Sequence, residues 1–165
     1  MDPDERKDFR RPNPPGGHGP WGDSRPRGEE RSEMQERILE FGKELSDLSK
    51  VGAARIVEIS QDMGKHLASS KAGGIDLKIN QIRRFLDEVR QIETSIKNNK
   101  FDPDRIILLR PKLAYAAGRE RKVIPLMNVL DPAIKSAAQS VENFTKLLRL
   151  IEGIVAYHRF NEGTN

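Results

Sequence analysis

Basic and aromatic side chains gather in one stretch of the chain, LLRPKLAYAAGRERK, residues 108–122. On a helical wheel, Lys112, Tyr115 and Arg119 fall in one arc, well separated from the arc of apolar residues. Lysine and arginine bind phosphate oxygens, and a tyrosine ring can contact a ribose or a base. The pattern is compatible with nucleic-acid binding. A solvated basic face, with Tyr115 packed at the rim of the core, explains the same residues equally well.

Residues that could carry catalysis are sparse. The chain has no cysteine and three histidines, and it contains neither a phosphate-binding loop nor an HExxH zinc motif. His66 and His158 lack carboxylates at metal-ligand spacing. Asp102, Asp104 and Asp131 stand where helices are expected to begin, a common structural place for aspartate. We therefore expect no enzymatic activity, no metal and no cofactor.

Helices are the elements that must position the basic residues. Beyond the N-terminal segment, apolar residues recur at three- and four-residue intervals, and no segment alternates as a strand does. The stripes over 34–48 and 56–67 predict two helices, or one helix bent near 49–52. Glycines and small polar residues predict a loop over 69–76, and the stripe over 79–96 predicts a further helix.

Two Asp-Pro pairs predict helix starts. Asp102 suits the N-cap position, and Pro103 suits the first helical position, where a missing N–H is no loss. Asp131 and Pro132 repeat the pattern and are expected to open the longest helix, whose apolar stripe runs over 134–155.

The helix that carries the basic stretch contains two residues that disturb helices. Pro111 is expected either to kink it or to start a new turn. Gly118 is expected to end it in the left-handed conformation, so the place of Arg119 on the wheel is an extrapolation.

The 134–155 stripe keeps a strict three-four alternation, which a helix can bury inside its own bundle or against another protein. With several amphipathic helices in one chain, the internal bundle is favoured. The predicted fold is all-α, a compact bundle of about five to six helices over residues 32–165.

Residues 1–31 differ in composition from the rest. They hold six of the ten prolines and few large apolar side chains, too few to offset the entropy of ordering the backbone. A disordered tail is therefore expected, and a solvated spacer is favoured over a weak RNA-binding or partner-docking arm.

The net charge is +4, and most of the excess lies in residues 101–165, with 10 basic against 7 acidic side chains. No apolar run approaches the length needed to span a bilayer, and no signal peptide is recognised. Together with the absence of cysteine, these features favour a cytoplasmic protein without a membrane partner.

Three sequence motifs, in this order along the chain, resemble those of a known family: QIRRF at 81–85, RPKLAYAAGR at 110–119 and VIPLMNVLDPAI at 123–134. A predicted long C-terminal helix follows them. They are similar to the small subunit of type III-A CRISPR effector complexes, the Csm family. The resemblance covers roughly residues 50–160 and leaves the N-terminal tail outside.

The resemblance implies a compact helical bundle with a scaffold role. Small subunits of this family stack in several copies along the ribonucleoprotein, and their basic faces line the channel for the CRISPR RNA (crRNA) and target RNA. Target RNA cleavage belongs to the backbone subunits, whereas DNA cleavage and cyclic oligoadenylate synthesis belong to the large subunit. The implied partners are crRNA, target RNA, backbone subunits, the large subunit and other copies of this chain.

The residues expected to contact RNA come from the basic stretch over 108–122 and from the motifs that resemble the family. At least one of the adjacent arginines in QIRRF must point outward from its helix. The candidates are Arg83, Arg84, Arg110, Lys112, Tyr115, Arg119, Arg121 and Lys122, with Lys50, Arg55 and Lys65 of the second helix as additional ones. For Tyr115, a place at the rim of the core is favoured over stacking on a base.

Two alternatives need no RNA. A helical module could bind proteins through the long stripe, with its charge serving solubility alone. A DNA-binding helix-turn-helix is weaker, because the apolar PLMNVL after the turn is a poor recognition surface.

Overall fold

Helices account for most of the described chain in the computed structural model, which describes residues 27–68, 70 and 74–163. These residues contain no strand, so the all-α prediction is confirmed. The α-helices are α1 (Arg27–Leu45), α2 (Ala53–Leu67), α3 (Ile79–Lys97), α4 (Pro103–Ile107), α5 (Leu109–Arg119), α6 (Ile124–Ala137) and α7 (Val141–Glu162). Two short 3-10 turns, η1 (Leu48–Lys50) and η3 (Arg121–Val123), join them. Within the same residues, no helix is both long and apolar enough to cross a membrane.

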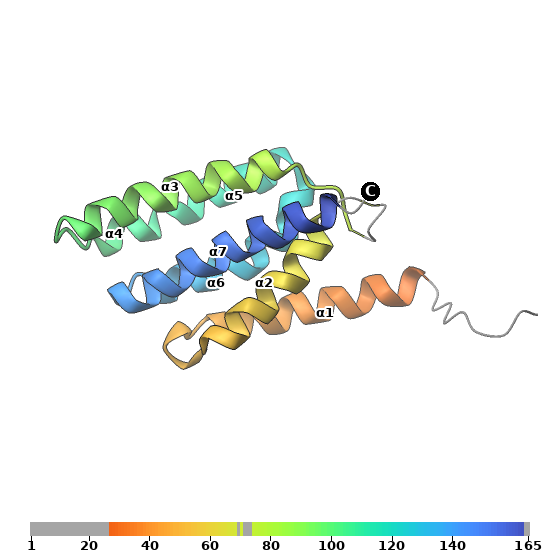
Figure 1. Cartoon of the computed structure of the whole chain (residues 1–165), viewed down its shortest axis with the longest axis horizontal. Helices are drawn as coiled ribbons and strands as arrows, with labels where there is room; N and C mark the ends of the chain where they lie inside the picture. The colour runs from red at the N-terminus through yellow and green to blue at the C-terminus, as the bar shows by residue number, and fades with distance from the viewer. Residues whose placement is uncertain (1–26, 69, 71–73, 164–165) are drawn as a thin grey trace, which may run out of the picture.

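Helix α7 lies at the centre of the arrangement (Figure 1). It packs along α2 on one side and along α3 on the other, with α6 also against it, while α1 packs on α6. The apolar stripe predicted over 134–155 is largely buried, including Phe144, Leu148 and Ile151. The expectation that this stripe packs inside the bundle is therefore confirmed.

Small residues let α2 and α7 pack backbone to backbone. A methyl group added at Gly64 would lie 2.5 Å from the Cβ of Tyr157, and one at Gly153 would lie 2.5 Å from the hydroxyl of Ser60. That hydroxyl donates hydrogen bonds to the carbonyls of Ile56, at 2.7 Å, and Leu150, at 3.1 Å. The two helices therefore run in the same direction at a separation that larger side chains would not permit.

Helix α1 begins at Arg27, inside the segment that the sequence assigned to the tail; the expectation for residues 1–26 lies outside the described residues. Its buried side chains include Ile38, Phe41 and Leu45. It packs closely on α6 at Gly42, where an added methyl group would lie 2.8 Å from the carbonyl oxygen of Asn128.

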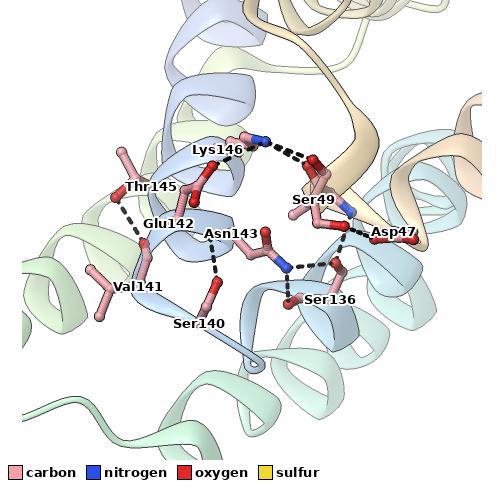
Figure 2. A network of polar contacts seen from close by, with 10 residues as sticks. Asp47, Ser49, Ser136, Ser140, Val141, Glu142, Asn143, Thr145 and Lys146 are labelled. Atoms are coloured by element: carbon pink, nitrogen blue, oxygen red, sulfur yellow. Dashed lines mark hydrogen bonds and ion pairs between the residues drawn. The ribbon is translucent and has the colours of Figure 1, made fainter.

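A partly buried polar network holds the turn between α1 and α2 (Figure 2). The backbone N–H of Leu48 donates to the Ser136 hydroxyl at 2.8 Å, and the Asn143 amide donates to the Ser136 carbonyl at 3.1 Å. The Lys146 ammonium donates to the carbonyls of Leu48, at 2.9 Å, and Ser49, at 3.3 Å. Because buried polar groups require partners, these bonds tie η1 to α6 and α7.

The two Asp-Pro pairs behave differently. Asp102 caps α4 by accepting from the N–H groups of Asp104 and Arg105, and Pro103 begins the helix, as predicted. The prediction for Asp131 and Pro132 is wrong, because both lie inside α6.

The longest helix, α7, begins instead after Ser140, whose hydroxyl accepts from the N–H of Asn143 at 3.1 Å. Helix α6 continues through Pro132 because residues on both sides of it, such as Val129, Leu130 and Ile134, are fully buried. Their burial outweighs the hydrogen bond that proline cannot donate.

The predicted end of the helix at Gly118 is also wrong. Helix α5 runs through Gly118 to Arg119, and the N–H of Glu120 then bonds to the Ala116 carbonyl at 3.0 Å. Pro111 lies in the first turn of α5, where proline is tolerated, so its role as the start of a new helical segment is confirmed.

Candidate nucleic-acid interface

Helices α3 and α5 lie side by side and run in opposite directions (Figure 1). Polar contacts fix their register. The Arg105 guanidinium donates to the Ser95 hydroxyl at 2.6 Å, and the Lys112 ammonium forms an ion pair with Glu88. Beyond the end of α5, the Lys122 ammonium donates to the carbonyl oxygen of Asp76, at 3.2 Å, just before α3.

This register brings Arg84 and Tyr115 to one surface. Arg84 lies one turn before Glu88 on α3, and Tyr115 lies nearly one turn after Lys112 on α5. Both side chains are exposed. The guanidinium carbon of Arg119 lies 5.8 Å from the centroid of the Tyr115 ring. We call Arg84, Lys112, Tyr115 and Arg119 the α3–α5 surface.

The expectation that Tyr115 packs at the rim of the core is wrong, because 67% of this residue is exposed. The core positions of α5 are Leu109, Leu113 and Ala117, and Tyr115 points away from the face that they share.

Several of the exposed arginines have no carboxylate partner among the described residues. Arg83 and Arg84 are both exposed, and the described residues offer neither of them an ion pair within 4.0 Å. The same holds for Arg119 and for Arg121 in η3. These four guanidinium groups are therefore available to an external anion.

Arg159 of α7 belongs near this group, although the sequence did not single it out. The ion pair between Arg90 and Glu152, at 3.2 Å, and the contact of Leu77 with His158 show that α3 and α7 are antiparallel. Arg159 therefore lies toward the end of α7 where α3 begins, and it is exposed without a carboxylate partner in the described chain. A helical wheel of α7 would have placed it outside the apolar stripe.

Other predicted contacts are engaged within the fold. Arg110 makes a two-pronged ion pair with Asp131, at 2.7 and 3.1 Å, which raises the pKa of Arg110. Arg55 binds Glu44, at 2.8 and 2.6 Å, and Glu58 at 2.9 Å. Hydrogen bonds to these two carboxylates raise the pKa of Arg55 and lower that of Glu44. Both arginines join helices.

Lys50 and Lys65 lie elsewhere. Lys50 lies in η1 and not in the second helix, and its ammonium forms an ion pair with Asp47 at 2.9 Å. Lys65 is exposed on α2, which lies on the opposite side of α7 from α3 (Figure 1). The structure therefore does not bring either lysine to the α3–α5 surface.

The two described histidines are parts of the packing. His158 is fully buried, and its Nε2 is 2.8 Å from the carbonyl oxygen of Leu77. Burial lowers the pKa of His66. Within the described residues, no group of three or more histidine and carboxylate side chains is placed to hold a metal ion. The chemistry available at the α3–α5 surface is electrostatic binding of a polyanion, with an aromatic ring beside the cations.

Comparison with known proteins identifies the family. A family model described as Csm2 Type III-A matches residues 50–164, which include helices α2 to α7 and every predicted contact residue. Helix α1 precedes the match. No curated protein and no solved structure matches the chain. Because the match covers more than half of its length, the chain belongs to the Csm2 family, the small subunits of type III-A CRISPR effector complexes.

Proposed function

We propose that the chain is a non-catalytic small subunit that stacks in several copies within its effector complex and contacts crRNA or target RNA through the α3–α5 surface. Arg83, Arg121, Lys122 and Arg159 extend this contact at the adjoining end of the bundle. Membership of the family supports the place in the complex. We infer that the complex acts in the cytoplasm.

One observation gives the proposed RNA contact its main support. Arg84 and Arg119 are exposed and have no carboxylate partner in the described chain, whereas Arg55 and Arg110 are bound to carboxylates. A guanidinium without such a partner can bind a phosphate without first giving up an internal ion pair, so it contributes more to affinity. Such contacts follow the RNA backbone and do not read bases, which suits a complex whose guide RNA selects the sequence.

The two arginines can be tested by substitution. We expect Arg84→Ala combined with Arg119→Ala to weaken binding of the full chain to labelled RNA, to a similar degree for unrelated sequences. Log affinity should also depend less steeply on log salt concentration, by roughly 0.7–0.9 for each phosphate that the variant no longer neutralises. Fluorescence anisotropy measures both the affinity and its salt dependence. The titrations start at low salt because one subunit binds few phosphates.

Lys43→Ala combined with Lys100→Ala is the matched control. Both lysines are exposed and have no ion-pair partner among the described residues, but they lie outside the α3–α5 surface. Equal weakening in the two double variants would contradict the proposed location, and unchanged binding by the arginine variant would do so as well.

Stacking of copies is proposed to use one end of the bundle. Leu108, between α4 and α5, and Val141, at the start of α7, are exposed apolar residues. The junction of α4 with α5 and the start of α7 lie toward the same end of the bundle (Figure 1). Exposed apolar residues near helix ends are suited to contact with another copy. A protein-docking module without an RNA role has little support, because the long stripe that favoured it is largely buried.

A further inference from the structure

Tyr115 is exposed without a structural reason in the described part of the chain. It exposes 67% of its surface, and its hydroxyl makes no hydrogen bond within the described residues. Some of its neighbours on α5 are small: Ala114 is exposed, and a methyl group added at Gly118 would meet nothing within 4 Å. Apart from the Arg119 side chain, little on α5 covers the ring, so it is accessible to a flat ligand.

One cation lies over the ring, and others share its surface. The Arg119 guanidinium lies over it, with 5.8 Å between the guanidinium carbon and the ring centroid. The register set by the Lys112–Glu88 ion pair puts Arg84 of α3 and Lys112 of α5 on the same surface as the ring. An aromatic ring among cations can hold a base by stacking while the cations bind the phosphates on either side of that base.

From this geometry we propose that Tyr115 and Arg119 form a stacking platform for one unpaired nucleobase. The α3–α5 surface would then bind single-stranded or bulged RNA more tightly than a continuous duplex. The reason is geometric, because the bases of a duplex already stack on one another and only an unpaired base can offer its face to the tyrosine. Phosphate contacts alone would not make this distinction. The inference rests on the proposed RNA contact and adds the class of RNA that the surface prefers.

The test compares three RNAs of roughly 10 nucleotides or base pairs, in the range of single-strand site sizes: a single strand, a blunt duplex and a duplex with one bulged nucleotide. We expect Tyr115→Ala in the full chain to weaken binding of the single strand and the bulged duplex about five- to tenfold, as removal of one stacked base would. Binding of the blunt duplex should hardly change. Tyr115→Phe keeps the ring and should retain the preference.

Leu39→Ala is the control, because Leu39 is an exposed apolar residue of α1, far along the chain from the α3–α5 surface.

A second readout is photocrosslinking of RNA that contains 5-iodouridine, followed by mass spectrometric identification of the modified residue. Crosslinks at Tyr115 with the single strand and not with the blunt duplex would support the platform.

Three results would overturn the inference. If Tyr115→Ala weakens binding of all three RNAs equally, the ring does not select unpaired bases. If Tyr115→Ala changes binding of none of the three RNAs, but the variant with Arg84→Ala and Arg119→Ala binds all three more weakly, the surface binds RNA without a stacking platform. If the wild-type chain binds none of the RNAs at low salt and gives no crosslink, the proposed RNA contact fails with it.

Discussion

At the scale of single residues, internal partners set how available each cation is. Lys112 belongs to the α3–α5 surface, but Glu88 already holds its ammonium group. A phosphate must compete with that carboxylate, and an acidic side chain beside the site also repels RNA. Glu88 is therefore expected to lower the affinity of the surface for RNA.

We predict that Glu88→Gln raises RNA affinity about two- to fivefold at low salt, the range expected for releasing an exposed ion pair. Anisotropy titration of the full chain measures the change. Glu93→Gln removes the same charge from the same helix, but Glu93 pairs with Lys97, toward the other end of α3. An equal gain in both variants would mean that net charge, and not release of Lys112, is responsible.

The environments of single residues are also the hardest feature to predict from sequence. Periodicity placed Lys112, Tyr115 and Arg119 together on one helix. It did not show that Arg110 is bound to Asp131 or that Lys112 is bound to Glu88, because such pairs depend on the register between helices. The exposure of Tyr115 likewise depends on which face of α5 meets the core.

At the scale of elements, the close approach of α2 and α7 is the most demanding contact. Gly64 on α2 lies against Tyr157 and His158, with 2.5 Å from an added methyl carbon to the Cβ of Tyr157 and 2.8 Å to the backbone nitrogen of His158. Backbone atoms cannot move aside as a flexible side chain can, so the helices themselves would have to separate.

We predict that Gly64→Ala destabilises the fold by about 1–3 kcal/mol, the usual range for overpacking, or by more if α2 detaches. Gly118→Ala is the matched control, because Gly118 is also helical but has open space around it, and this change should stabilise by up to about 1 kcal/mol. Urea unfolding followed by circular dichroism measures both. Equal stability of the two variants would contradict the close α2–α7 packing.

Helix types and most helix positions were predictable, because apolar stripes at three- and four-residue intervals directly indicate buried helix faces. The residues at which helices begin were harder to predict. The same Asp-Pro pair begins α4 and lies inside α6, and the difference comes from what surrounds it. Apart from the half-buried Phe101, the residues just before Pro103 are polar and exposed. Buried apolar residues flank Pro132 on both sides, and this tertiary burial overrides the local signal.

At the scale of the whole molecule, the family match and the charge distribution point to a subunit of a larger assembly. The match covers α2 to α7, and the exposed arginines of α3 and α5 lie within it. In the proposed role, one subunit offers few phosphate contacts, so its affinity for RNA should be modest, and several stacked copies would multiply it. The function is therefore best tested in the assembled state.

The most direct measurement is to purify the tagged chain gently, at low salt, from the cells that produce it naturally, and to identify the RNA and proteins that accompany it. We predict short RNAs that share one repeat-derived 5′ end, together with a large subunit and backbone subunits. Recovery of the chain alone, or with unrelated proteins and no RNA, would contradict the proposed role in an RNA-guided effector complex.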